Sequence, residues 1–312
     1  MPANEMWLYI PFGVIVLVML AIDLGVFNRK AHEVGLKEAL IWSIVWTVVA
    51  LLFNAGVFFY AGTTKGLEFF TGYLIERALS FDNLFVFVLI FSYFGVPARY
   101  HHRALFWGVV GALVTRAIFI AAGAALITRF EWILYLFGAL LIYSGWKMLR
   151  EKNFEVAPDK NIIIRGARKL FPVAEGFASG KFFLRKEHVL YLTPLLLVLI
   201  TVETTDIIFA VDSIPAVFGV TQDPFIVFTS NIFAILGLRA TYFLLSGVLE
   251  TFHYLSHGLS VVLIFIGAKM LLADVVHVSI GISLAIVMGV LTVAVVASLV
   301  KRRTGRQVQS GS

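Results

Sequence analysis

Nine apolar runs follow one another along the chain, separated by shorter polar segments. Each run is near or above the roughly 17–20 residues that an α-helix needs to cross the hydrocarbon core of a bilayer. Inside lipid such runs must be helical, because no water is present to satisfy an exposed backbone. The pattern therefore predicts nine membrane-spanning helices, near residues 8–26, 39–61, 69–94, 104–127, 132–149, 189–218, 225–249, 256–272 and 279–300.

The composition agrees with this pattern. Apolar residues make up 60% of the 312 positions and charged residues 14%, and the mean hydropathy is +0.93. Soluble domains are roughly 45–50% apolar and about 25% charged. The formal charge of +6 suggests an acidic partner, but the basic residues lie between the apolar runs. We therefore expect a lipid bilayer, and no nucleic acid, as the partner of an all-α, polytopic bundle of transmembrane helices.

The placement of Lys and Arg predicts the orientation, because cytoplasmic segments carry an excess of both. With the N-terminus outside, eighteen of these residues fall in inside segments, and only Lys65 and Arg129 fall outside. We therefore expect an N-out, C-in protein whose first run is a retained helix. The polar segment 150–188 is interpreted as an ordinary positive-inside loop rather than a site for lipid headgroups or a regulatory partner. No pattern indicates an oligomeric state.

An internal repeat relates the middle spans to one another. Gly145 and Lys147 recur as Gly267 and Lys269 in the same local motif, and an Arg-Ala pair at 116–117 recurs at 239–240. Three spans separate the two copies, so they insert with opposite orientation, as the inverted repeats of secondary transporters do. The predicted division is peripheral spans in 1–68, a first repeat in 69–149, a basic loop in 150–188, a second repeat in 189–272, and a last span with a basic tail in 273–312.

Acidic residues fall inside two corresponding spans of the repeat. A charge at that depth costs at least about 2.5–3.5 kcal/mol and needs a compensating partner. Glu76 and Asp82 have the same spacing as Asp206 and Asp212, and Glu203 shares a helix face with Asp206. A bound cation is the economical explanation. The predicted metal-binding residues are Glu76, Asp82, Asn83, Glu203, Asp206 and Asp212.

The donor atoms of these residues narrow the choice of ion. Carboxylate, amide and hydroxyl oxygens suit Mn²⁺, Ca²⁺ and Mg²⁺, and the sequence has no cysteine for thiolate ligands or disulfides. Pro215 lacks a backbone N–H and predicts a break in the sixth span beside Asp212, where freed carbonyls would add donors. The alternative interpretation is that the acids form structural ion pairs with Arg77, Arg116 and Arg239. Arg116 and Arg239 are expected to be helix-packing counter-ions.

Several motifs carry a resemblance to a known family. They are GYLIE at 72–76, SFDN at 80–83, DIIFAVDSIPA at 206–216, TQDPF at 221–225 and TSNIFAILGLR at 229–239. With these motifs the sequence resembles the TerC family, and within it the alkali-inducible Alx-type membrane proteins. The resemblance implies a multi-pass protein of the bacterial inner membrane, akin to the LysE transporter superfamily, that exports Mn²⁺. Its implied transport residues are Glu76, Asp82, Glu203, Asp206 and Asp212.

These observations predict a secondary-type transporter that exports divalent metal cations, above all Mn²⁺, by alternating access around the membrane acids. Proton exchange is chemically natural for such a site, and sodium coupling is equally compatible. The alternatives are a transporter of Ca²⁺ or of cationic amino acids, and a membrane stress or pH-response scaffold acting through residues 150–188. We expect no enzymatic activity and no cofactor, since the spans hold no nucleophile paired with a base, no HExxH motif and no glycine-rich phosphate loop.

Overall fold

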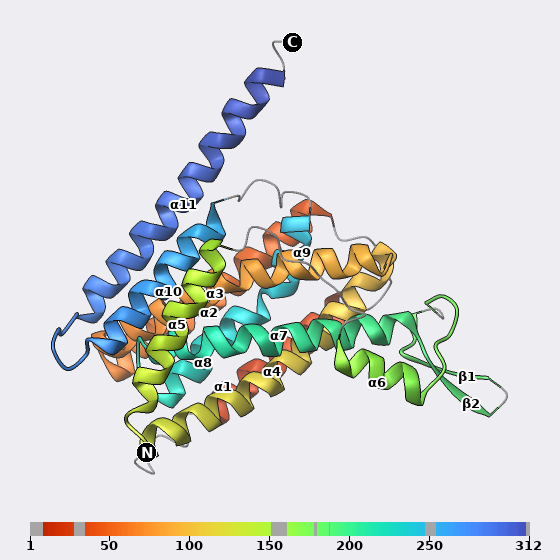
Figure 1. Ribbon diagram of the computed structural model, residues 1–312, viewed down its shortest axis with the longest axis horizontal. Helices are drawn as coiled ribbons and strands as arrows, with labels where there is room; N and C mark the ends of the chain where they lie inside the picture. Colours follow the sequence, from red (N-terminus) through yellow and green to blue (C-terminus); the bar gives the residue numbers. More distant parts are fainter. Residues whose placement is uncertain are drawn as a thin grey trace.

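The computed structural model describes residues 9–27, 35–150, 161–177, 180–186, 188–246 and 254–309. In these ranges the chain folds into a bundle of α-helices with one short β-hairpin (Figure 1). The elements are α1 (Tyr9–Phe27), α2 (Leu36–Ala61), α3 (Thr63–Tyr93), α4 (Ala98–Arg129), α5 (Ile133–Arg150), α6 (Ile162–Leu170), β1 (Phe183–Lys186), β2 (Val189–Leu192), α7 (Pro194–Phe218), α8 (Pro224–Leu236), α9 (Leu238–Ser246), α10 (Leu255–Leu271) and α11 (Ile280–Gln309).

The helices lie where the apolar runs predict them. Every predicted span coincides with one helix, apart from the seventh, which corresponds to α8 and α9 together. By length and composition, four helices in the described part of the chain can cross a membrane, namely α2, α4, α7 and residues 280–301 of α11. The bent pair α8–α9 makes a fifth. The chain is therefore an all-helical, multi-pass membrane protein, and the full number of nine spans stays a prediction.

Two details of the helices differ from the sequence-based expectation. The predicted break at Pro215 is wrong, since α7 continues through this residue to Phe218. Pro215 leaves the carbonyl of Val211 without its helical N–H partner, and membrane helices tolerate this where neighbouring groups or local adjustment satisfy the freed carbonyl. The bend occurs instead at Gly237, where the axes of α8 and α9 meet at 41°. The sixth span also begins later than predicted, because α7 starts at Pro194 behind the N-cap residue Thr193.

The helices of the two predicted repeats contact each other reciprocally. α3 packs along α8, α4 packs along α7, and α5 packs along α10. α3 also contacts α7 and α10, while α7 also contacts α5, and α4 contacts α8. Exchanging α3, α4 and α5 for α7, α8–α9 and α10 therefore leaves the set of contacts between the two groups unchanged.

Small residues allow α5 and α10 to approach closely. A Cβ atom added at Gly138 would lie 2.9 Å from the carbonyl oxygen of Gly267, and one at Gly267 would lie 2.6 Å from that of Gly138. Further along, a Cβ added at Gly145 would lie 2.7 Å from the carbonyl oxygen of Ser260. In lipid, helices associate through such close packing, because burying apolar surface against another helix brings little gain over lipid.

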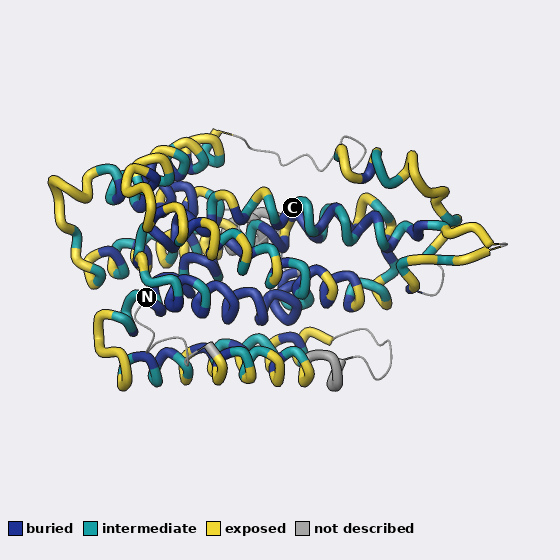
Figure 2. The backbone as a smooth tube through the Cα atoms, turned by 90° about the horizontal axis from the view of Figure 1, so that it is seen from below, coloured by how far each residue is buried: buried dark blue, intermediate teal, exposed yellow. Residues whose placement is uncertain are grey.

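Buried residues gather along the central helices, and exposed positions line the outside of the bundle (Figure 2). One buried apolar cluster joins α3, α4, α7 and α9 and includes Ile90, Leu105 and Val198. Large apolar side chains such as Phe59 and Tyr60 are exposed on the outside, where a bilayer would cover them. The packed interior is therefore the place to look for polar groups that serve a function.

Candidate functional site

A buried cluster of polar side chains is centred on Arg116 of α4. Its guanidinium forms an ion pair with Glu76 of α3 and a second one with Oδ1 of Asp206 on α7, at 3.4 Å. The same group donates hydrogen bonds to Oγ of Ser213 at 2.9 Å and to Oδ1 of Asn231 at 3.0 Å. All five side chains are buried. Four helices, two from each predicted repeat, therefore meet at one guanidinium.

The surroundings hold this cluster in a defined geometry. The amide of Asn231 donates from Nδ2 to the carbonyl oxygen of Val227 at 2.9 Å, which turns its Oδ1 toward Arg116. α8 itself begins at Pro224, where the carboxylate of Asp223 accepts from the first backbone N–H groups, a favourable N-cap arrangement. The position of Asn231, two turns further along α8, follows from that start.

The charges of the cluster do not balance. One guanidinium faces the two carboxylates of Glu76 and Asp206, so one negative charge is uncompensated when both acids are ionised. The Oδ2 atom of Asp206 also has no hydrogen-bond partner among the described residues. A buried carboxylate oxygen without a partner is costly, and a proton or a small cation at this point would relieve that cost.

The remaining predicted site residues lie at other helix contacts. Asp82 of α3 accepts a hydrogen bond from Oγ of Ser256 on α10 at 2.9 Å. Asp212 of α7 accepts one from Oγ of Ser144 on α5 at 2.6 Å. Both aspartates are partly buried. Each therefore has a hydroxyl partner from the third helix of the other repeat.

Glu203 and Asn83 have different surroundings. Glu203 is partly buried and its carboxylate lies against Gly111 of α4, in the space that a Cβ at that glycine would need. Asn83 is buried, and its Nδ2 has no hydrogen-bond partner within the described ranges. Of the six predicted ligands, the structure thus brings Glu76 and Asp206 together. Among the described residues, no three His, Asp or Glu side chains are grouped so that they could hold a metal ion.

Arg77 binds neutral groups, whereas the alternative interpretation of the sequence predicts an ion pair with the membrane acids. Its guanidinium donates to the carbonyl oxygen of Ala234 at 3.2 Å, to Oγ1 of Thr241 at 2.6 Å and to Oγ of Ser43 at 3.3 Å. These contacts fill the bend at Gly237 between α8 and α9, where a side chain would collide with the guanidinium. Arg116, in contrast, is the counter-ion that the sequence suggests.

Sequence reasoning did not single out the hydroxyl and amide partners. Ser144 and Ser256 are single polar residues on helices, and such serines often bond to their own backbone one turn earlier, so nothing marked them as partners of acids. Asn231 is a lone amide in an apolar run inside the 229–239 motif. A polar group in that setting needs a partner, and this was the signal that could have found it.

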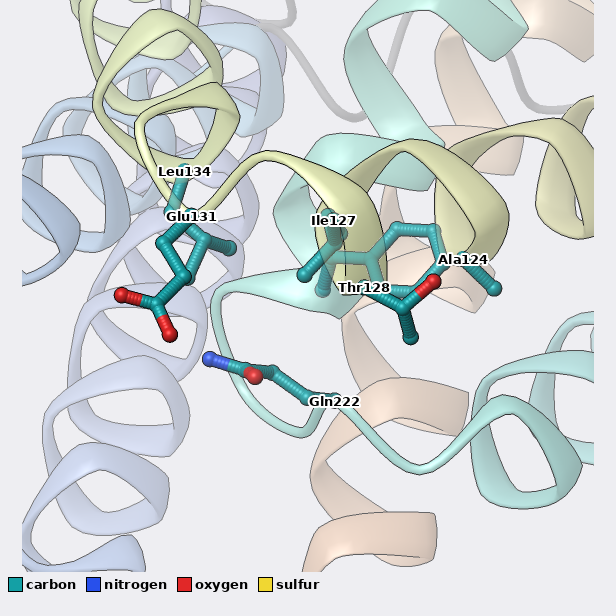
Figure 3. A pocket seen from close by; sticks show the side chains of 7 residues that line it. Ala124, Ile127, Thr128, Glu131, Leu134 and Gln222 are labelled. Atoms are coloured by element: carbon teal, nitrogen blue, oxygen red, sulfur yellow. The ribbon is translucent and has the colours of Figure 1, made fainter. Parts of the chain in front are cut away.

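A separate cavity of about 190 Å³ lies where the end of α4 and the start of α5 meet the end of α7. Figure 3 shows the carboxylate of Glu131 and the amide of Gln222 turned toward each other across it, with Thr128 nearby. Phe218 lines the same cavity. None of the predicted metal-binding residues is part of this lining.

Together, the apolar helices and the buried charge cluster define a polytopic membrane protein with an ionic centre inside its helix bundle. The comparisons with known proteins agree with this class. The profile described as "Integral membrane protein TerC family" matches residues 61–306. The chain belongs to the TerC family.

Similar proteins cover nearly the whole chain. An "Uncharacterized membrane protein STKORF319" of Myxococcus xanthus is 51% identical over 95% of this chain and 93% of its own length. The "Putative membrane-bound redox modulator Alx" of Escherichia coli (strain K12) is 50% identical over 90% of each chain. A membrane protein of Rickettsia bellii described as uncharacterized is 37% identical over 94% of this chain and 97% of its own. No solved structure matches the chain.

Proposed function

We propose that this protein is a transporter of divalent metal cations, with Mn²⁺ as its principal substrate and export as its direction. One observation carries the proposal: inside the bundle, one guanidinium is shared by two carboxylates from different helices. Membrane proteins rarely keep charged residues at such depth unless they serve ions or protons. The uncompensated charge makes this cluster attractive to a cation, and protonation of a carboxylate gives a route for release.

The arrangement of the helices supports transport by two inverted repeats. The contacts between α3–α5 and α7–α10 are reciprocal. In the sequence repeat, Gly145 corresponds to Gly267 and, at the same offset, Gly138 corresponds to Ser260. The observed close approaches are Gly138 with Gly267 and Gly145 with Ser260. This exchange of partners is what a two-fold axis between inverted repeats would produce, and repeats of this kind rock against each other in many secondary transporters.

The identity of the ion rests on chemistry and on the family resemblance. Carboxylate, amide and hydroxyl oxygens around Arg116 are hard donors, suited to Mn²⁺, Ca²⁺ and Mg²⁺ rather than to thiophilic metals. The TerC resemblance selects Mn²⁺ among them. We further propose the bacterial inner membrane as the location, with the N-terminus outside and the basic segment 150–188 inside, from the distribution of Lys and Arg.

Several relatives are named "redox modulator". The present sequence has no cysteine, so its 312 residues provide no thiol for disulfide exchange. An effect on the redox state of a cell would then be indirect in this protein, through the metal that it moves.

The test is ion flux into proteoliposomes that contain the purified protein and a metal-sensitive dye, with Mn²⁺, Ca²⁺ and Mg²⁺ offered in parallel at several pH gradients. Mn²⁺ flux should be the fastest. Asp206→Asn should abolish it, whereas Glu175→Gln, which neutralises an exposed acid outside the predicted spans, should leave it unchanged. The proposal fails if none of the three ions moves faster than in empty vesicles, or if Asp206→Asn transports at the normal rate per folded molecule.

A further inference from the structure

The basic segment between α5 and α7 contains a folded unit that packs on the start of α7. It consists of α6 and the hairpin β1–β2 at one end of the bundle (Figure 1). Ile164 of α6 is fully buried against Leu192 and Leu197. The backbone N–H of Leu192 donates to the carbonyl oxygen of Pro172 at 2.9 Å, and Thr193 Oγ1 donates to that of Lys181 at 2.7 Å. The unit is therefore fixed to the end of a candidate span.

α6 has an apolar face and a basic face. Ile163, Ala167 and Leu170 recur at the spacing that places them on one side of a helix. Arg165 and Lys169 lie on the opposite side and are exposed. Helices with this division lie in the plane of a membrane surface, with basic groups among the headgroups and apolar groups against the acyl chains.

The apolar face of α6 borders an open groove. The groove has a volume of about 410 Å³, and its other walls are Leu196 and Ile200 of α7 and Phe183 of β1. Its lining is almost wholly apolar. Leu170, at the edge, is 78% exposed, which is unfavourable in water. Apolar cavities of roughly 150 Å³ already take up apolar ligands in place of water.

Charge complementarity decides which apolar molecule fits. Arg185 lies two residues after Phe183 on β1, and alternation along a strand places it on the same face of the hairpin. Lys186, Arg165 and Lys169 are also exposed on this unit, but strand alternation and helical spacing place them on the faces away from the groove. The groove also lies beside the first two turns of α7, where that span enters the bilayer. We propose that the groove binds one acyl chain of an anionic phospholipid, whose phosphate is held by Arg185.

The test compares phosphatidylglycerol with phosphatidylcholine of identical acyl chains. The full-length protein is delipidated in detergent, titrated with each lipid, and analysed by native mass spectrometry. Phosphatidylglycerol should be retained preferentially. Arg185→Gln should reduce this preference by about fivefold, because one basic residue near anionic lipid contributes about 1 kcal/mol. The matched control, Lys186→Gln, removes an exposed charge on the other face of the hairpin and should preserve it.

A second variant tests the groove itself. Ala167→Trp fills the groove and keeps every charge, so it should remove the retained lipid while the protein stays monodisperse. If that variant misfolds, a fluorophore on Leu170→Cys gives the readout, because brominated phosphatidylglycerol should quench it more than brominated phosphatidylcholine does. Equal retention of both lipids by the unaltered protein would overturn the proposal. So would a dimer that Ala167→Trp abolishes, since the groove would then be an interface between copies. This inference is independent of the transported ion.

Discussion

Replacement of Arg116 by methionine is the most decisive perturbation of the buried cluster. The substitution removes the guanidinium that contacts both Glu76 and Asp206, and it takes a donor from Ser213 and Asn231. Breaking a buried ion pair by removing one partner costs about 3–5 kcal/mol. At roughly 2–4 °C of melting temperature per kcal/mol for a large domain, Arg116→Met should lower the Tm by about 6–20 °C.

The two acids should respond differently from the arginine. Glu76→Gln or Asp206→Asn leaves one carboxylate opposite one guanidinium, so the cluster becomes neutral. Each of these variants should change the free energy of unfolding by no more than about 1 kcal/mol, in either direction. The bond from Arg116 then ends on a neutral amide in place of a carboxylate, which weakens it, but the excess negative charge of the cluster is removed. Combining both acid substitutions with Arg116→Met should recover most of the loss, since no stranded charge remains.

Thermal unfolding of the purified proteins in one detergent, followed by circular dichroism, measures these differences. Arg129→Met is the matched control, because Arg129 is exposed at the end of the same helix and its loss should leave the Tm unchanged. The reasoning is refuted if Arg116→Met costs no more than Arg129→Met. It is equally refuted if Glu76→Gln destabilises as much as Arg116→Met, since the cluster would then need both acids.

Three further predictions concern packing, transport and topology. Gly267→Ala should lower the Tm, because its Cβ would meet a backbone carbonyl of α5, whereas Gly289→Ala has open space and should not; equal melting curves would contradict the close contact. Asp212→Asn should abolish protection of cells against manganese overload at unchanged Tm, because its serine partner can donate to the amide oxygen as well; normal intracellular manganese in this variant would exclude a transport role. A cysteine at Thr64 should react with an impermeant thiol reagent added to whole cells, whereas one at Ser179, which lies outside the described residues, should be protected; labelling of the latter would invert the orientation.

The helices were predictable because membrane insertion imposes length and apolarity on each of them. Each apolar run contains a helix or the bent pair α8–α9, although the sixth run begins in β2, and lipid offers the backbone no other partner. Breaks and bends within the helices were harder to predict. Pro215 suggested a break in α7, but the helix continues through it to Phe218, as membrane helices often do at a proline. At the bend at Gly237 the guanidinium of Arg77, from another helix, bonds to the carbonyl oxygen of Ala234, and no local pattern predicts this contact.

The sequence named candidate site residues but did not predict which of them meet, and of the six only Glu76 and Asp206 come together at Arg116. Depth in the membrane marked the acids, and the same argument named Arg116 as a counter-ion. Which acid meets Arg116 depends on how α3 and α7 are rotated about their axes, and the sequence does not specify that rotation. The hydroxyl partners Ser144 and Ser256 come from helices far along the chain, so only tertiary packing identifies them.

Helical geometry explains why the acids separate into two kinds of contact. Six residues along a helix rotate a side chain by about 120°, so Glu76 and Asp82 point to different neighbours on a continuous α3. A break at Pro215 would have allowed Asp206 and Asp212 to converge, but α7 is continuous, and Asp212 meets α5 instead of Arg116. If Asp82 and Asp212 take part in moving ions, they therefore do so where α3 meets α10 and where α7 meets α5, away from Arg116. These two contacts exchange when α3–α5 and α7–α10 are exchanged, as the other contacts between the two groups of helices do.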